Sequence, residues 1–331
     1  MKKALVIGVS GQDGAYLSRL LLDKGYEVYG ASRDAEINSF QALRRLGTFE
    51  RVQLVSMSLT DFRSILQVLT RTLPDEIYNL AGQSSVGLSF QQPVETIEGI
   101  AIGTLNLLEA IRFLARPIRF YNAASVECFG DTEEIVNESS PLRPVSPYSV
   151  AKAAAYWEVA NYRQAYGLFA CSGMLSNHES PLRPERFVTR KIVAAACRIA
   201  RGSRESLGLG NIEIMRDWGW APEFAEAMWR MLQQEYPEDY VIGTGVSYTL
   251  REFVDHAFRA VGLDWIHHTE VRVELQRPSD ILRSRVDPSK AHVELGWRAE
   301  FTMPDVVRMM MAEDLASQVN WEPKVEAHSV A

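Results

Sequence analysis

The chain has 331 residues, of which 47% are apolar and 23% charged, and its formal net charge is −7. These proportions are those of a globular protein large enough to bury a cofactor, and they exclude collagen-like, disordered and small disulfide-rich proteins. The negative net charge argues against a nucleic-acid partner, and no apolar run reaches the ~18 residues of a membrane span. The three cysteines lack metal-ligand spacing, so we expect no metal site. The leading class is a cytoplasmic enzyme.

The first half of the chain alternates between apolar runs of strand length and stretches with helical spacing. Strands are predicted at 4–9, 26–31, 51–57, 76–81, 119–126 and 168–175, and helices at 15–22, 94–115 and 149–166. This alternation predicts βαβ units and therefore a parallel sheet. Beyond residue 176 the alternation ends and prolines punctuate shorter elements. We expect a smaller, irregular α/β lobe there that binds the substrate and packs against the sheet around a cleft.

Three glycines at Gly8-x-x-Gly11-x-x-Gly14 follow the first predicted strand and open the first helix. Glycines at such a turn let the backbone approach a pyrophosphate and let the helix pack closely on the strand. The helix N-terminus then offers free N–H groups to the phosphates. Inside a βαβ unit this pattern favours a dinucleotide site over a purely structural turn. It makes the predicted sheet a Rossmann-type, doubly wound one.

The residues after the second strand bear on the choice of nicotinamide cofactor. An acidic side chain there binds a ribose diol, whereas an arginine accepts a 2′-phosphate. Arg33 stands at this point and is followed by Asp34, so both patterns are present. Arg44 and Arg45 could also reach a phosphate or form a solvated helical face. NADP is favoured over NAD.

The chemical centre is predicted where the fifth strand ends and the helix after it begins. Tyr148 and Lys152 lie at i and i+4 on one helical face, where the ammonium group is expected to lower the pKa of the phenol and make it a general base. Ser125 can hydrogen-bond a reacting hydroxyl. Glu127 is either a solvated loop carboxylate or a second acid–base group. His178 is expected to be a packed loop residue and not a metal ligand, since no second ligand lies at the right spacing.

These residues together resemble the extended short-chain dehydrogenase/reductase superfamily and, in detail, the GDP-mannose 4,6-dehydratases. The similar segments are 11–17 (GQDGAYL), 79–84 (NLAGQS), 146–152 (SPYSVAK), 161–163 (NYR), 177–181 (NHESP), 187–191 (FVTRK), 209–211 (LGN) and 216–219 (RDWG). The resemblance runs from about residue 4 to 315. It implies an NADP-binding domain at 1–176, joined by about 213–243, and a GDP-sugar-binding lobe at 177–212 and 244–331. It also implies a homodimer or homotetramer.

The resemblance further implies a reaction without net redox change. Tyr148 takes the proton from the sugar O4 as hydride leaves C4 for NADP⁺, and Ser125 bonds the developing carbonyl. Glu127 then removes the C5 proton, water leaves C6, and hydride returns to C6.

The implied site residues fall into three groups. The catalytic residues are Ser125, Glu127, Tyr148 and Lys152. The cofactor-binding residues are Gly8, Gly11, Gln12, Asp13, Gly14, Arg33, Leu59, Leu80, Ala81, Ser84, Tyr148, Lys152, His178 and Arg183. The substrate-binding residues are Ser85, Ser125, Glu127, Asn177, Val188, Lys191, Gly210, Arg216 and Arg277, with Arg216 suited to the pyrophosphate.

Several positions depart from the family pattern. Ser125 replaces a threonine, Val126 a small polar residue and Ser58 an aspartate that meets the adenine. Ser85 and Ser176 stand where bulkier residues are common, which leaves a larger sugar such as a GDP-manno-heptose as an alternative substrate.

Two other functions are compatible with the same fold. One is a GDP-4-keto-sugar reductase or epimerase, which would not need Glu127. The other is a catalytically silent nucleotide-sugar or NADP sensor, which could lose Tyr148 or Lys152.

Overall fold

The larger part of the molecule is built on one parallel sheet. The computed structural model describes residues 1–317. Seven strands lie in the order β10-β6-β5-β4-β1-β2-β3, and every neighbouring pair is parallel. They are β1 (Lys3–Ile7), β2 (Glu27–Ser32), β3 (Gln53–Ser56), β4 (Glu76–Asn79), β5 (Arg119–Ser125), β6 (Ala170–Leu175) and β10 (Tyr240–Ile242). The predicted doubly wound α/β class is confirmed.

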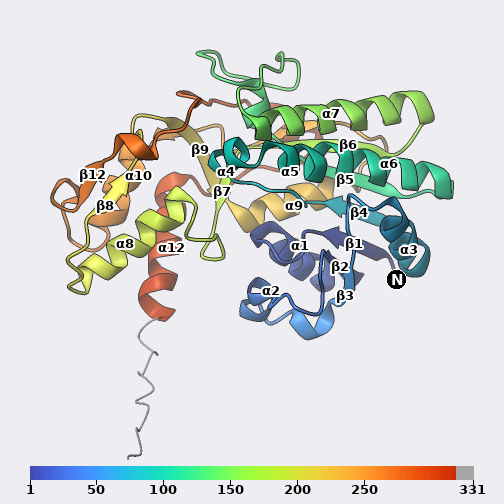
Figure 1. Ribbon diagram of the computed structural model, residues 1–331, viewed down its shortest axis with the longest axis horizontal. Helices are drawn as coiled ribbons and strands as arrows, with labels where there is room; N and C mark the ends of the chain where they lie inside the picture. Colours follow the sequence, from blue (N-terminus) through green and yellow to red (C-terminus); the bar gives the residue numbers. More distant parts are fainter. Residues whose placement is uncertain (318–331) are drawn as a thin grey trace, which may run out of the picture.

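Helices cover both faces of this sheet, so its central strands are buried on both sides. Figure 1 shows α5, α6 and α7 above the sheet and α1 and α9 beneath it. The bounds are α1 (Gln12–Asp23), α2 (Gln41–Arg45), α3 (Phe62–Thr72), α4 (Val86–Gln91), α5 (Pro93–Ile97), α6 (Gly103–Leu114), α7 (Pro147–Tyr166) and α9 (Ala221–Met231). One apolar core packs α1 and α9 on one face, and another packs α3, α6 and α7 on the other. Burial on both faces explains why β1 is apolar from Ala4 to Ile7 and why β6 carries only apolar or small side chains.

Some predicted bounds are wrong in informative ways. The predicted first strand ends at Ile7 and not at Val9, because the glycine turn begins at Gly8. A 3₁₀ turn at Phe49–Arg51 shortens the third strand. The predicted helix 94–115 is interrupted by a π-helical turn at Glu98–Ile102, which separates α5 from α6.

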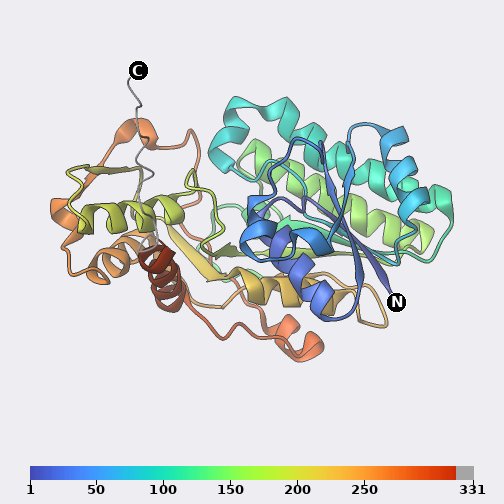
Figure 2. The ribbon, with the colours of Figure 1, turned by 90° about the horizontal axis from the view of Figure 1, so that it is seen from below.

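The smaller lobe lies to one side of the sheet (Figure 2). Its helices are α8 (Val188–Ala200), α10 (Leu250–Arg259) and α12 (Met303–Ser317), whereas α11 (Ser289–Leu295) packs against α9 and β10 of the large sheet. Its strands are β7 (Asn177–Glu179), β8 (Leu207–Leu209), β9 (Met215–Trp220), β11 (Ser247–Thr249) and β12 (Thr269–Val271), arranged as β11-β9-β7 and β12-β8. A separate apolar core joins α8, α10 and α12. The chain returns to the large sheet at β10, and residues 318–331 of the predicted lobe lie outside the described residues.

Asp239 fastens the returning strand β10 to the rest of the sheet. Its carboxylate accepts both Nη groups of Arg163 on α7, at 3.0 and 2.6 Å, and the N–H of Ser172 on β6 at 2.7 Å. Asp239→Ala leaves these donors unpaired in a mostly buried site, so we expect the free energy of unfolding to fall by about 3 kcal/mol. Urea titration measures it. The control is Glu213→Ala, which removes an exposed pair with Arg251 and should cost at most about 1 kcal/mol. Equal losses in the two variants would contradict the anchoring role.

Candidate active site

A cavity of about 390 Å³ lies between the sheet and the smaller lobe. It begins at the carboxyl ends of β4, β5 and β6, which is where doubly wound sheets bind ligands. The predicted site residues that line it are Asp13, Leu80, Ser84, Ser85, Ser125, Glu127, Tyr148, Lys152, Asn177, His178, Arg183, Val188, Lys191, Gly210, Arg216 and Arg277. Those outside its lining are Gly8, Gly11, Gln12, Gly14, Arg33, Leu59 and Ala81. The structure therefore brings together residues from nearly the whole length of the described chain.

The glycine turn has the geometry that a dinucleotide requires. Gly8 has a φ of 87°, and a Cβ there would lie 3.0 Å from the backbone nitrogen of Ala81. A Cβ on Gly14 would lie 2.5 Å from the carbonyl oxygen of Gly8, so only glycine lets α1 pack this closely on the turn. The N-cap residue Gly11 brings no side chain to the free N–H groups of α1. These residues fit a bound pyrophosphate.

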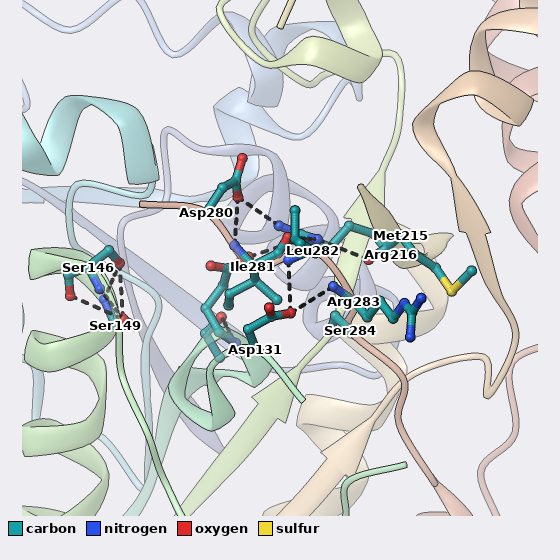
Figure 3. Close-up of polar contacts among 12 residues, drawn as sticks. Asp131, Ser146, Ser149, Met215, Arg216, Asp280, Ile281, Leu282, Arg283 and Ser284 are labelled. Atoms are coloured by element: carbon teal, nitrogen blue, oxygen red, sulfur yellow. Dashed lines mark hydrogen bonds and ion pairs between the residues drawn. The ribbon is translucent and has the colours of Figure 1, made fainter. Parts of the chain in front are cut away.

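Tyr148 is positioned by a reciprocal cap at the start of α7. The Ser146 hydroxyl accepts the N–H of Ser149 at 3.1 Å, and the Ser149 hydroxyl accepts the N–H of Ser146 at 3.0 Å (Figure 3). Pro147 occupies the first turn, where its missing N–H costs nothing. The cap therefore fixes the first turn of α7, which carries Tyr148.

Lys152 and Tyr148 are both buried, but their electrostatics differ from the expectation. The Lys152 ammonium donates to the carbonyl oxygen of Ala123 at 2.6 Å and lies 5.9 Å from the centre of the Tyr148 ring. Burial lowers the pKa of Lys152 to about 8. Burial also raises the pKa of Tyr148, which the Ser125 hydroxyl offsets only in part. The predicted lowering of the phenol pKa by Lys152 is therefore wrong for the protein alone, because burial of Tyr148 outweighs the favourable contacts of its phenol.

Glu127 is not a solvated loop residue. It lies in a short 3₁₀ turn directly after β5, where its N–H donates to the Ser125 hydroxyl at 3.2 Å. Its carboxylate faces the buried guanidinium of Arg216 on β9, with Oε1 3.5 Å from Nε. Arg216 also contacts Asp280 at 3.1 Å. The arginine expected to be free for a pyrophosphate is thus shared between two carboxylates.

Asp13 and His178 form an ion pair across the cofactor end of the cavity, with Oδ2 3.0 Å from Nε2. The other ring nitrogen of His178 lies 2.7 Å from the carbonyl oxygen of Ser176, so both nitrogens face acceptors and the imidazolium form is favoured. Burial opposes both charges, but the pair outweighs it: the pKa of Asp13 falls to about 2 and that of His178 rises. His178 is packed as expected, with its ring stacked on Phe224 at 4.4 Å, but it lies on strand β7 and not in a loop.

Arg183 is paired as well. Its Nε lies 3.2 Å from the buried carboxylate of Glu179. Sequence reasoning did not single out Glu179, because its partner becomes apparent only when β7 and the following turn are folded.

The residues expected near the adenosine lie outside this cavity. Arg33 follows β2 with an exposed side chain 3.6 Å from Glu95. The Asp34 carboxylate accepts the N–H groups of Glu36 and Ile37, at 2.9 and 3.1 Å. Asp34 is therefore engaged in its own turn, while the guanidinium of Arg33 faces outward.

The far end of the cavity is formed by the smaller lobe. Lys191 on α8 donates to the carbonyl oxygen of Gly208 at 2.7 Å, and a Cβ on Gly210 would lie 2.9 Å from the carbonyl oxygen of Leu275. Arg186 also lines this end, although sequence reasoning missed it. Its position directly before the 187–191 segment was the available signal.

The two serines linked to sugar size have structural partners. The Ser85 hydroxyl accepts the N–H of Leu88 at 3.3 Å and so caps α4. The Ser176 hydroxyl donates to Asp217 at 3.3 Å. Both line the cavity, but each hydroxyl already serves the fold.

The sequence was compared with known proteins. It matches the family described as GDP-mannose 4,6 dehydratase over residues 5–310. GDP-mannose 4,6 dehydratase 1 of Arabidopsis thaliana is 45% identical over 324 residues, which cover 95% of this chain and 90% of that protein.

Solved structures share the fold at lower identity. A double mutant of DesIV, a dTDP-glucose 4,6-dehydratase from Streptomyces venezuelae with NAD bound, gives a TM-score of 0.85 at 23% identity, covering 97% of this chain and 99% of that one. RMD from Pseudomonas aeruginosa, complexed with NADPH, gives a TM-score of 0.77 at 22% identity, covering 96% and 98%.

The ion pair between Asp13 and His178 makes a prediction about pH. Because the pKa of His178 is raised, the stability that the pair contributes is lost as pH rises through that raised pKa. Because the pKa of Asp13 is lowered, the same contribution is also lost as pH falls toward about 2. In Asp13→Asn the ion pair is lost while burial still opposes the charge, with only the Ser176 carbonyl still favouring it, so we expect the pKa of His178 to fall. NMR titration of the imidazole measures it. Asp264→Asn, which changes a carboxylate beside His267, is the control. An unchanged titration of His178 in Asp13→Asn would contradict the pair.

Proposed function

The chain belongs to the GDP-mannose 4,6-dehydratase family, and from that premise we propose that it converts GDP-mannose to its 4-keto-6-deoxy derivative with NADP as cofactor. The observation that carries the proposal is the presence of Glu127 in the same cavity as Ser125, Tyr148 and Lys152. Oxidation of an alcohol needs one acid–base group, whereas elimination of water needs a second base. A reductase or epimerase has no use for this carboxylate.

Each catalytic side chain has one task in the proposed reaction. Tyr148 takes the O4 proton, and the Ser125 hydroxyl donates a hydrogen bond to the carbonyl that develops at C4. The C4 ketone makes the C5 proton acidic; Glu127 removes this proton and passes it to the C6 hydroxyl, which leaves as water. A proton from solvent then returns to C5 through Glu127 as hydride is added at C6. NADP would be held at the glycine turn and would supply the acceptor for the C4 hydride and its donor at C6. The side chain of Val126 has no acidic proton, so it cannot help to protonate the leaving C6 hydroxyl.

Lys152 acts on Tyr148 by position and by charge. Its ammonium is held beside the end of β5 by the carbonyl oxygen of Ala123. A pKa of about 8 leaves it largely charged at neutral pH. A buried cation stabilises a nearby phenolate once substrate has displaced water from the site.

Charge in the cavity supports a substrate with a diphosphate. Within residues 1–317, the lining cations Lys152, Arg186 and Lys191 form no ion pair with a carboxylate. Lys191 and Arg186 lie at the end formed by α8, far along the cavity wall from the glycine turn. The diphosphate of a GDP group at the α8 end, together with a dinucleotide pyrophosphate at α1, would balance the positive charges of these lining cations.

Arg33 and Asp34 support NADP over NAD. The Asp34 carboxylate is occupied by backbone N–H groups, which removes the acidic ligand for a ribose diol. Arg33 has an exposed guanidinium that lies 3.6 Å from Glu95. The solved relatives contain NADPH in one case and NAD in another.

A homodimer fits the exposed apolar side chains on the α5–α7 face. Val94 is 67% exposed, Phe113 70% and Trp157 59%, on helices that pack side by side (Figure 1). Exposed apolar side chains on neighbouring helices are typical of an interface. No helix in residues 1–317 is both long and apolar enough to cross a membrane. We propose a cytoplasmic enzyme.

Glu127→Gln tests the elimination directly. The variant keeps the shape of the side chain but cannot accept a proton, so we expect C4 oxidation to proceed and the reaction to stall before C5, with overall turnover lowered roughly 10²–10⁴-fold. Absorbance of reduced nicotinamide and solvent deuterium at C5 are the measurements. Tyr148→Phe is the matched control and should block both steps. Normal deuterium incorporation in Glu127→Gln would remove Glu127 from the mechanism.

Arg33→Ala tests the cofactor. The loss of a cation that pairs with the 2′-phosphate should weaken NADP binding about tenfold and leave NAD binding nearly unchanged. Calorimetric titration of both cofactors measures this. Glu95→Gln frees Arg33 without removing it and should not weaken NADP. Equal losses for the two cofactors in Arg33→Ala would refute the preference for NADP.

A further inference from the structure

A segment of the smaller lobe crosses the cavity wall directly behind the proposed base. This segment, residues 277–283, is called the strap here. On one side it is bound to β9, where the N–H of Met215 donates to the carbonyl oxygen of Leu282 at 2.7 Å. On the other side the Asp131 carboxylate accepts the N–H groups of Leu282 and Arg283, at 2.9 and 3.0 Å (Figure 3). The strap is therefore fastened to the turn that follows the catalytic strand.

A row of four alternating charges runs from the strap to the base. Arg277 lies 3.2 Å from Asp280, Asp280 lies 3.1 Å from Arg216, and Arg216 lies 3.5 Å from Glu127. Figure 3 shows Asp280 and Arg216 facing each other across this part of the site. Arg277, Arg216 and Glu127 line the cavity, whereas Asp280 stands behind them.

The guanidinium of Arg216 is held in one orientation. One of its terminal nitrogens donates to the carbonyl oxygens of Met215 and Ile281, at 2.9 and 2.7 Å, and the other donates to Asp280. Nε is the guanidinium nitrogen nearest Glu127, and it lies 3.5 Å from Oε1, which is longer than an ordinary hydrogen bond. Buried charges this close act strongly on each other, because little water screens them.

We propose that Asp280 is a positioning residue of the elimination step, which rests on the proposed function. The Asp280 carboxylate pairs with the guanidinium of Arg216 behind the cavity wall. Arg216 therefore orients Glu127 without forming a tight ion pair with it. Glu127 then keeps its carboxylate free toward the sugar C5. Asp280 and the proposed substrate-binding residue Arg277 both belong to the strap. The alignment of Glu127 therefore also depends on the position of the strap.

Asp280→Asn is the variant that isolates this effect. The amide oxygen still accepts from Arg216, so the geometry is kept while the charge is lost. Arg216 then has Glu127 as its only carboxylate, and the base is drawn toward the guanidinium. We expect C5 deuterium exchange and kcat for water loss to fall about tenfold, with C4 oxidation in a single turnover changed much less. Reduced nicotinamide should accumulate. Asp280→Glu, which restores the charge, should recover most of the exchange rate.

Asp131→Ala is the matched comparison. It releases the strap from the same neighbourhood but leaves the pair between Asp280 and Arg216 in place. Its expected effect is a higher KM for GDP-mannose, with the ratio of C5 exchange to C4 oxidation as in the parent protein. Thermal unfolding of each variant gives its stability.

The outcomes separate the two proposals. If the parent protein removes no water from GDP-mannose, the proposed function fails. If the parent protein is active and Asp280→Asn keeps the parent ratio of exchange to oxidation, the role of Asp280 is overturned. Equal loss of both steps in Asp280→Asn would overturn it too, since a purely structural defect affects oxidation and elimination alike.

Discussion

The cavity depends on ion pairs whose two charges come from different parts of the chain. Asp13 belongs to the helix that opens the Rossmann-type sheet, and its partner His178 belongs to the smaller lobe. Glu127 follows β5, and its partner Arg216 lies on β9. Each pair is mostly buried, and a buried charge is stable only when it is compensated. The two parts of the chain must therefore meet in one arrangement, and that arrangement defines the walls of the cavity.

The local parts of the site follow from the sequence because they depend on spacing alone. The glycine turn needs three glycines at the junction of a strand and a helix, and the Tyr148–Lys152 pair needs only one helical turn. The cap formed by Ser146 and Ser149 likewise involves residues three apart. The sheet could be predicted as well, since buried parallel strands are unbroken apolar runs. The comparisons support the resemblance drawn from these motifs.

The remainder of the site depends on contacts between distant residues. Nothing in the sequence near Arg216 indicates that Glu127, 89 positions earlier, would compete with a phosphate for it. The raised pKa of His178 depends on Asp13, and the raised pKa of Tyr148 depends on burial that only the folded chain creates. Spacing places side chains on a face of one element, whereas a pKa reflects everything packed around the group. The expected lowering of the phenol pKa failed for this reason.

The arrangement of charge along the cavity gives a physical account of how one site handles two steps. Among residues 1–317, Lys152 is the cation near Tyr148 that forms no ion pair, and it favours a negative oxygen at O4. Near Glu127 the cation Arg216 is already balanced by a second carboxylate, so the base is oriented there without being neutralised. Tyr148 and Glu127 thus experience different electrostatic fields although both lie beyond the carboxyl end of β5. Asp280, behind the cavity wall, accounts for that difference in charge, while Glu127 itself is the group by which a fold shared with epimerases adds an elimination to an oxidation.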